Sequence, residues 1–240
     1  MSQPPTSHPA HPARTRQFRP GILRFSVAQL LGALVLMLVS YPFLEEFKYG
    51  QLLEGFFMTL TFTMAIMAVG HRRRPFIIAI FLMVPTLVAR WLNHFFPNAV
   101  PKSIFLAATV FCLGFMVYQL LRYILREPKV NSEVLCGAVA TYLMLGWLWA
   151  FGYMLVDRLV PGSFTYAANM TGGHSMTGFM PIYYSFCTLC TVGYGDVVPA
   201  TNLVRMLAVM ESITGVFFGT ILIARLVALY SSRPSSTVEN

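Results

Sequence analysis

Six apolar stretches, each close to the length that a helix needs to cross a bilayer, constrain the fold of this chain most. They comprise residues 26–44, 52–70, 76–92, 103–125, 134–156 and 203–230. A hydrocarbon core about 30 Å thick requires about 20 apolar residues in a helix that spans it. Because backbone groups find no water there, a single stretch of this kind enters lipid as a helix. The sequence therefore predicts an all-α membrane protein with six transmembrane helices.

The composition of the 240-residue chain also favours a lipid environment. Hydrophobic residues make up 56% of it and charged residues only 11%, whereas soluble domains carry roughly 25% charged residues. Membrane lipid is therefore the predicted solvent of most of the surface. The net charge of +8 is also typical of nucleic-acid binders, but the placement of the basic residues indicates a different origin.

Most basic residues fall on one side of the membrane if the six spans simply alternate. That side receives Arg14, Arg16, Arg19, Arg24, Arg72, Arg73, Arg74, Arg122, Arg126, Lys129, Arg225 and Arg233. The opposite side receives Lys48, Arg90, Lys102, Arg158 and Arg205. Positive charge marks the cytoplasmic side. Both termini are therefore predicted to be cytoplasmic, and no nucleic-acid partner is expected.

Polar segments divide the chain into four parts. Residues 1–25 are predicted to form a disordered basic cytoplasmic N-terminus, because they are rich in Pro, His and Arg. The apolar run that follows is too long for a signal peptide and is expected to remain as the first span. A four-helix transmembrane unit at 26–126 and a second unit at 134–230 come next, with Pro128 between them and Ser132 as a candidate N-cap. Residues 231–240 form a short cytoplasmic tail.

A short apolar segment at 179–190 precedes the hexapeptide Thr191-Val192-Gly193-Tyr194-Gly195-Asp196. The segment is too short to span, so it is predicted to be a re-entrant helix buried in protein. The partial negative charge of its C-terminal end would favour cations. Gly193 and Gly195 can adopt positive φ without a Cβ clash, and alternating handedness would point successive carbonyls to one side. Val192 and Tyr194 would then pack outward against the re-entrant helix, and Thr191 could offer both its carbonyl and its hydroxyl.

The sequence YYSFCTLCTVGYGDVVP at 183–199 resembles the pore signature of the potassium-channel family. Residues 211–230 resemble the inner helix of the bacterial two-span pore modules in that family. The resemblance implies that the selectivity-filter loop coordinates dehydrated K⁺ with Thr191, Val192, Gly193, Tyr194 and Gly195. Four such loops build one filter, so a homotetrameric pore, or a subunit of a heterotetramer, is expected. The permeant ion is K⁺, no cofactor is expected, and the implied location is a bacterial inner (plasma) membrane.

The resemblance also marks Gly215, twenty residues after Gly195, as a candidate gating hinge. An alternative is close helix packing, since Gly219 follows in a small-xxx-small arrangement. Two positions depart from the family pattern: Cys190 replaces a common threonine, and Cys187 replaces a glutamate that pairs with the filter aspartate in some members. Asp196 therefore needs another donor.

Tyr183 or Tyr184 is the expected donor to Asp196, and simple packing of both rings is the alternative. Thr188 is assigned to filter support with them. The four cysteines Cys112, Cys136, Cys187 and Cys190 lack metal-ligand spacing and are expected to be buried packing residues without disulfides.

The first four spans occupy the position of a voltage sensor but lack its ladder of arginines. Residues 103–125 contain only Arg122, at the cytoplasmic end, whereas a sensor moves several charges through the field. Strong voltage gating is therefore not expected. Arg90 is expected to snorkel to the interface rather than pair with Glu54, and His174 is expected to be a solvated loop residue. Glu211 is expected to make a structural hydrogen bond behind the filter rather than to act in conduction.

The function predicted from these features is a potassium-selective channel subunit that conducts K⁺ passively and is not an enzyme. The sequence contains no metalloprotease motif, phosphate-binding glycine loop or nucleophile elbow. A potassium uptake system with four linked pore repeats is disfavoured by the single pore loop. The alternative is a non-conducting or regulatory membrane subunit that assembles with other channel subunits, although such a subunit need not retain the intact filter motif.

Overall fold

The computed structural model describes residues 21–45, 47, 49–69, 73–96, 99–127, 132–167 and 175–231. The described chain is almost entirely helical. Its elements, in order, are α1 (Gly21–Leu44), α2 (Gly50–Val69), α3 (Arg73–Phe95), α4 (Lys102–Arg126), α5 (Ser132–Leu159), β1 (Phe164–Tyr166), α6 (Met180–Leu189), β2 (Val197–Pro199) and α7 (Asn202–Ser231). Among these, α1 to α5 and α7 are long and apolar enough to cross a membrane. The predicted six spans and the short seventh helix are confirmed.

The boundaries of two predicted segments require correction. Helix α1 begins at Gly21, so residues 21–25 are helical and not part of a disordered N-terminus, because Ile22, Leu23 and Phe25 extend the apolar run. Ser132 lies in the first turn of α5 rather than before it. The remainder of the predicted N-terminal segment, together with Pro128 and His174, lies outside the described residues.

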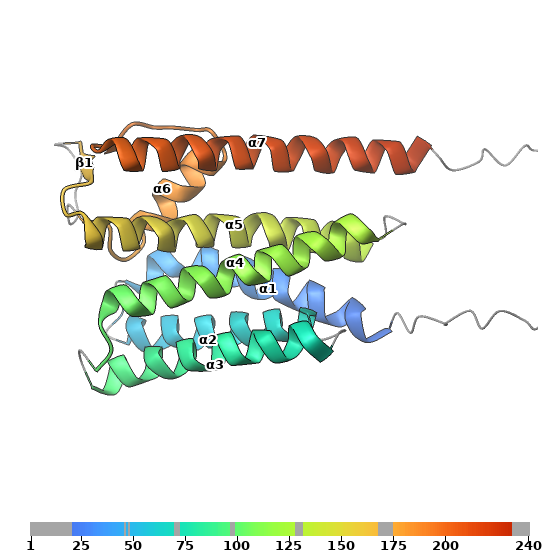
Figure 1. Cartoon of the computed structure of the whole chain (residues 1–240), viewed down its shortest axis with the longest axis horizontal. Coiled ribbons are helices and arrows are strands. Elements are labelled where there is room, and N and C mark those ends of the chain that lie inside the picture. Colours follow the sequence, from blue (N-terminus) through green and yellow to red (C-terminus); the bar gives the residue numbers. More distant parts are fainter. Residues whose placement is uncertain are drawn as a thin grey trace, which may run out of the picture.

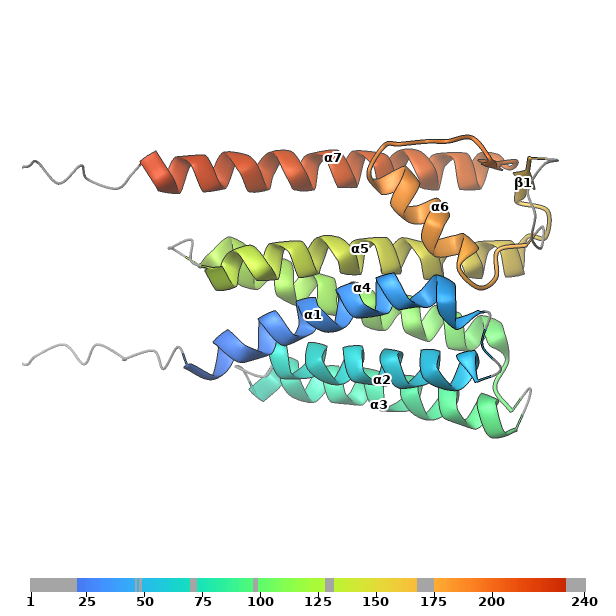
Figure 2. The same cartoon turned by 180° about the vertical axis from the view of Figure 1, so that it is seen from behind.

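The helices form two groups that share α5 (Figure 1). Helices α5 and α7 run alongside one another, and α6 crosses obliquely between them (Figure 2). Helices α1 to α4 gather on the other side of α5 (Figure 1). The first residues of α1 and the last residues of α7 lie at the same end of the bundle, as an even number of spans requires (Figure 1).

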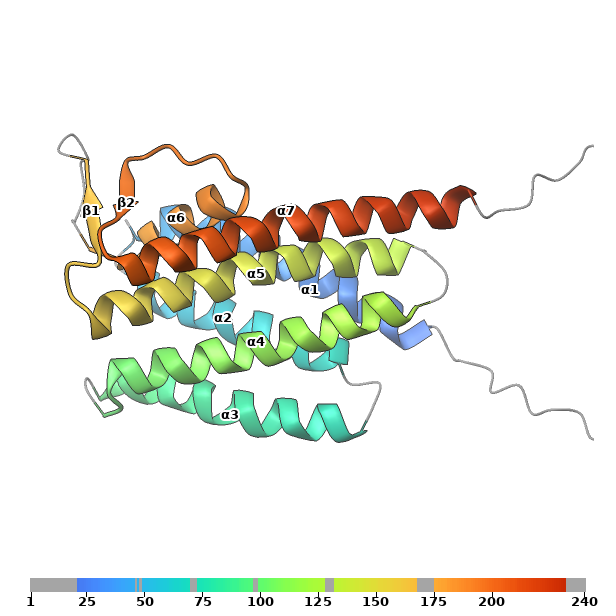
Figure 3. The same cartoon turned by 45° about the horizontal axis from the view of Figure 1, so that its top comes forward.

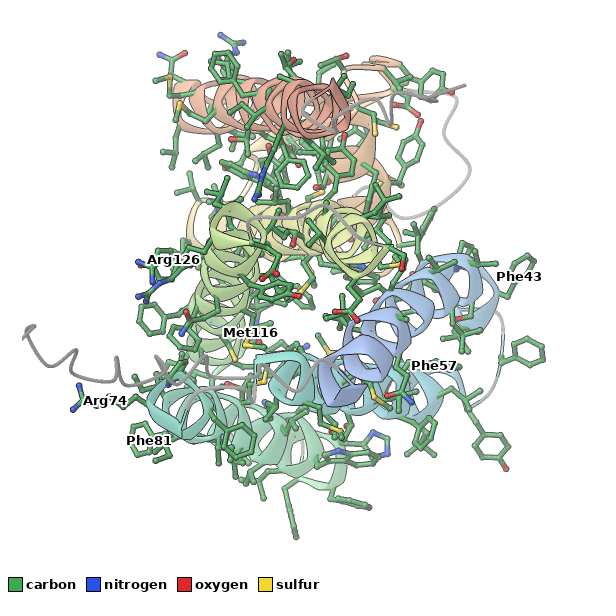
Figure 4. All side chains as sticks on the ribbon, turned by 90° about the vertical axis from the view of Figure 1, so that its right-hand side faces the viewer. Phe43, Phe57, Arg74, Phe81, Met116 and Arg126 are labelled. Atoms are coloured by element: carbon green, nitrogen blue, oxygen red, sulfur yellow. The ribbon has the colours of Figure 1, made fainter. Side chains whose placement is uncertain are left out.

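A continuous hydrophobic core joins the first four helices to α5 and α6. Its buried side chains include Leu30, Met83, Met116, Met144 and Leu189. Seen along the bundle, Met116 points inward whereas Phe43 and Phe81 project away from the helices (Figure 4). Phe81 is 76% exposed and Phe43 is 63% exposed. Large apolar side chains on the outside fit a surface that contacts lipid rather than water.

A short antiparallel pair of strands, not predicted from the sequence, closes the end of the second group (Figure 3). β1 pairs with β2 so that Phe164 lies opposite Pro199 and Tyr166 lies opposite Val197. The pairing is extended by the hydrogen bond from Ala167 N to Asp196 O, 2.8 Å. The strands therefore connect the loop that follows α5 to the residues that follow the hexapeptide.

Candidate functional site

The re-entrant helix α6 is capped at its start by another part of the chain. Pro181 stands in the first turn of α6, where a missing backbone N–H has no cost. The free N–H of Phe179 donates to Glu45 Oε1 in the α1–α2 link, 2.5 Å away. Gly178 just before it has a φ of 61°, and a Cβ at this position would lie 1.7 Å from the same carboxylate oxygen. The positive φ favours glycine at this position, and a Cβ would also displace the Glu45 carboxylate from Phe179 N.

The hexapeptide leaves α6 with a backbone of alternating handedness. Gly193 has a φ of 58° and Gly195 a φ of 78°, which confirms the conformation predicted for both glycines. Thr191 also has a positive φ, 58°. Such a φ is uncommon for a residue other than glycine and is found where the surroundings impose it, often at functional sites. No signal in the sequence distinguishes Thr191 from a threonine with ordinary backbone angles.

The first three amides of the hexapeptide donate to carbonyl groups at the end of α6. Thr191 N donates to Thr188 O at 3.0 Å, and Val192 N and Gly193 N donate to Cys187 O at 2.8 and 3.3 Å. Within the described part of the chain, no hydrogen bond uses a backbone carbonyl of residues 191–195 as acceptor. The arrangement therefore leaves the carbonyl groups of residues 191–195 without a donor among the described residues, while the amides of residues 191–193 are bound to the end of α6.

Two side chains of this loop depart in detail from their predicted places. The Thr191 hydroxyl donates to Cys190 O at 2.7 Å, so its proton is used within the loop. Val192 is 51% exposed rather than packed. Tyr194 does face α6 as predicted: its ring stacks on Tyr183, with centroids 6.3 Å apart and planes within 2° of parallel.

Asp196 is held by two hydrogen bonds, one of them from α6. The Tyr183 hydroxyl donates to Asp196 Oδ2 at 2.5 Å, and Val197 N donates to Oδ1 at 2.9 Å. Tyr184 points elsewhere, packing its ring edge-to-face against Tyr153. The structure therefore selects Tyr183 from the two tyrosines that the sequence left open as partners of Asp196.

Thr188 joins three parts of the site through its backbone. Its carbonyl accepts from Thr191 N at 3.0 Å and from Ser212 Oγ of α7 at 3.2 Å. Its hydroxyl donates to Tyr184 O at 2.8 Å. Thr188 therefore links α6 to the loop and to α7, as its expected supporting role requires. The two links between these elements use its backbone carbonyl rather than its side chain.

Glu211 is fully buried where α7 meets α5 and α6. Tyr153 of α5 lies 2.6 Å from Oε2, and Ser185 of α6 lies 2.5 Å from Oε1. The expectation of a structural hydrogen bond behind the filter is therefore met by two hydrogen bonds. Sequence reasoning missed both partners, which lie 58 and 26 residues away.

Two glycines mark close contacts around α6. A Cβ on Gly215 would lie 2.1 Å from Leu189 O at the end of α6, whereas Gly219 has no heavy atom within 4 Å of such a position in the described structure. The packing interpretation of Gly215 therefore has a direct geometric basis, with α6 and not Gly219 as the partner. A Cβ on Gly146 of α5 would lie 2.5 Å from the ring of Phe186. This close contact was not predicted from the sequence.

The cysteines are all free thiols, but only Cys112 is buried. Cys136 and Cys187 are partly buried and Cys190 is exposed, so the prediction that all four are buried is wrong. Cys190 lies at the inner end of the loop, 3.5 Å from the Tyr142 hydroxyl.

The strand pair contributes a partly buried tyrosine next to the end of the hexapeptide. Tyr166 of β1 lies opposite Val197. Burial, reinforced by the negative charge of Asp157, raises the pKa of Tyr166 to about 12. The hydroxyl of Tyr166 therefore stays protonated at physiological pH.

Two arginines make polar contacts between helices, one within the first four helices and one between α7 and the end of α4. Arg90 of α3 forms an ion pair with Glu54 of α2 at 3.1 Å, so the expectation that Arg90 only snorkels is wrong. Both side chains are about one-quarter exposed, and they pair because α2 and α3 are neighbours. At the opposite end, Arg225 of α7 donates to the carbonyl groups of Ile124 and Glu127. The sequence had assigned Arg225 to topology alone.

Comparison with known proteins agrees with this geometry. A family model described as "Ion channel" matches residues 134–232, the region from α5 to the end of α7. Residues 134–232 are therefore similar to the ion-channel family. The match agrees with the resemblance of this region to channels.

The chain is also similar to the "Two pore potassium channel c" of Oryza sativa subsp. japonica, with 35% identity over 69 residues. The matched region covers 29% of this chain and only 14% of that relative's length. No solved structure matches the chain.

Proposed function

We propose that this protein is a subunit of a tetrameric, potassium-selective channel that conducts K⁺ passively through residues 191–195. The observation that carries the proposal is the alternation of positive φ at Thr191, Gly193 and Gly195. Among the described residues, it leaves these carbonyl groups unused while the amides of residues 191–193 bind α6. A ring of such carbonyls can replace the hydration shell of a K⁺ ion. The named potassium channel in rice supports the choice of ion.

The exposed surface of the second group supports assembly. Helix α7 packs on α5, α6 and β2, and its remaining faces carry exposed apolar side chains: Met206, Val209, Ile213, Val216, Phe217, Ile221 and Ile223. In the filter loop, Val192 is 51% and Tyr194 is 71% exposed. One loop supplies only one wall of a filter, and four are needed. A homotetramer would cover these side chains and complete the ring.

The proposed orientation places the filter loop near the outer surface and both termini in the cytoplasm. The charge distribution supports this orientation, because most basic residues then face inward. Residues 134–230 would form the pore domain and residues 26–126 a voltage-sensor-like domain with few charges. The inner membrane of a bacterium is the proposed location, by resemblance to bacterial pore modules.

Purified protein in liposomes of defined lipid composition tests the proposal. We expect K⁺ flux that greatly exceeds Na⁺ flux under matched gradients, and block by Ba²⁺, whose radius is similar to that of K⁺. Reversal potentials under bi-ionic conditions give the permeability ratio directly. Equal permeability of K⁺ and Na⁺ would overturn the selective filter, and an absence of flux with intact tetramers would favour a regulatory subunit.

A further inference from the structure

Three short contacts form a chain of oxygen atoms behind the filter. Tyr153 Oη lies 2.6 Å from Glu211 Oε2. Glu211 Oε1 lies 2.5 Å from Ser185 Oγ, and Ser185 Oγ lies 2.8 Å from the backbone carbonyl oxygen of Gly146. The chain joins α7 to α6 and both to α5. Glu211 and Ser185 are each fully buried.

Whether Glu211 is charged can be inferred by counting the protons that are available for these three hydrogen bonds. A backbone carbonyl can only accept a hydrogen bond, a serine hydroxyl carries one proton, and an ionised carboxylate only accepts. If Glu211 were ionised, Ser185 could serve either Gly146 O or Glu211 Oε1 but not both. One of the two short contacts would then join two oxygens with no proton between them.

A protonated Glu211 removes this conflict. Glu211 then donates from Oε1 to Ser185, and Ser185 donates to Gly146 O. Tyr153 donates to Glu211 Oε2. Three protons occupy three contacts, and every donor has an acceptor.

Among the residues that the structure describes, no basic side chain lies against Glu211 to stabilise an anion. Within the described residues, the only salt bridge joins Glu54 and Arg90. Arg205, the basic residue nearest to Glu211 along α7, bonds Pro199 O and Asn202. The titratable groups that face Glu211 are the phenols Tyr142 and Tyr153 of α5 and Tyr184 of α6. An unpaired carboxylate inside a membrane protein is costly, whereas a neutral acid with all its hydrogen bonds made is not.

We propose that Glu211 is a neutral carboxylic acid at physiological pH and that its proton positions the pore helix behind the filter. Its consequence for conduction rests on the proposed channel function, but its protonation does not. Ser185 lies two residues before Cys187, whose carbonyl holds the Val192 and Gly193 amides. Through Ser185, the proton of Glu211 thus orients the end of α6 that supports the carbonyl row. Glu211 is a positioning residue and does not touch the ion.

Infrared difference spectroscopy on the full-length protein in lipid at neutral pH tests the charge. The wild-type spectrum minus that of Glu211→Gln should show the carbonyl stretch of a protonated carboxylic acid. The matched control is Glu54→Gln, which removes a carboxylate paired with Arg90 and should lose an ionised carboxylate band. Loss of an ionised band in Glu211→Gln would overturn the proposal.

A second measurement does not depend on the variant folding. Wild-type protein containing ¹³C-labelled glutamate should show an isotope-shifted protonated-carboxyl band at neutral pH. Absence of that band contradicts a neutral Glu211 directly.

The positioning role is tested by substitution in flux assays. Glutamine can donate to Ser185 and accept from Tyr153, so Glu211→Gln should conduct like the wild type and lack any pH dependence that arises from Glu211. Glu211→Ala leaves Tyr153 and Ser185 without their partner and should lose K⁺ selectivity or sustained current. Normal selectivity and current in Glu211→Ala would show that the Glu211 side chain does not position α6. If the infrared result holds while no variant conducts, only the channel function fails.

Discussion

Glu45 Oε1 accepts a hydrogen bond from the backbone N–H of Phe179 at 2.5 Å, although 134 residues separate them. The contact places a carboxylate from the link between α1 and α2 at the N-terminus of α6. Free amides and the helix dipole both favour an anion at such a place. One polar contact therefore joins the α1–α2 link to the N-terminal end of α6.

Replacing Glu45 with Ala should destabilise the subunit by about 0.3 to 1 kcal/mol, the range for an exposed anion at a helix N-terminus. Glu45→Gln keeps an oxygen that can accept from Phe179 N but removes the charge, so its effect should be smaller. Thermal unfolding of the tetramer in detergent, at low and high salt, measures both. Equal stability of wild type and Glu45→Ala at low salt would show that the cap contributes nothing.

Removing the Tyr183 hydroxyl should speed the loss of current during sustained opening while assembly remains intact. A hydrogen bond to a charged group contributes about 1.5 to 3 kcal/mol, and Tyr183 provides one of the two that hold Asp196. Tyr184→Phe is the matched control, since its ring packs on Tyr153 and should inactivate like the wild type. The opposite ranking of the two variants, or no difference between them, would rule out Tyr183 as the anchor.

Gly193→Ala should abolish conduction, because a Cβ opposes a φ of 58° at this position. The effect is conformational rather than steric, since no heavy atom lies within 4 Å of the position that the Cβ would occupy. Gly152→Ala in α5, where the same space is open at an ordinary helical φ, should conduct normally. K⁺ flux in liposomes compares the two, and a conducting Gly193→Ala channel would contradict the backbone geometry.

Gly215→Ala should reduce tetramer stability, because its Cβ would lie 2.1 Å from the Leu189 carbonyl oxygen. Gly219→Ala, which meets no atom within 4 Å in the described subunit, should be better tolerated unless a neighbouring subunit approaches it. Size-exclusion chromatography with thermal unfolding distinguishes packing from hinge motion. If Gly215→Ala assembles with normal stability and only its opening changes, Gly215 serves as a hinge.

Channel opening should depend weakly on voltage, because the basic residues of α4 lie at its two ends: Lys102 at the start, and Arg122 and Arg126 near the end. Each elementary charge that crosses the field contributes about 2.3 kcal/mol per 100 mV, so one charge cannot give steep gating. The slope of open probability against voltage in planar bilayers measures the gating charge. Arg122→Gln should leave that slope nearly unchanged, and a gating charge of several units per subunit would contradict the prediction.

The features that the sequence predicted correctly depend on short stretches of residues and not on contacts between distant parts of the chain. Length and apolarity determine the six spans, because lipid admits few alternatives to a helix. The shortness of 179–190 predicted α6, and the absence of a Cβ predicted the positive φ of Gly193 and Gly195. Each of these properties depends on a residue and its immediate neighbours, so no distant contact was needed.

Only the tertiary structure decided which groups meet across the chain. The sequence left Tyr183 and Tyr184 equivalent as partners of Asp196, and the rotation of α6 selected Tyr183. Thr191 adopts a positive φ because α6 holds the amides that follow it. The packing of distant helices brings Glu45 to Phe179 and Glu211 to Tyr153 and Ser185. Such pairs depend on helix rotation and depth in the bundle, which many weak packing contacts set together and no local pattern of residues encodes.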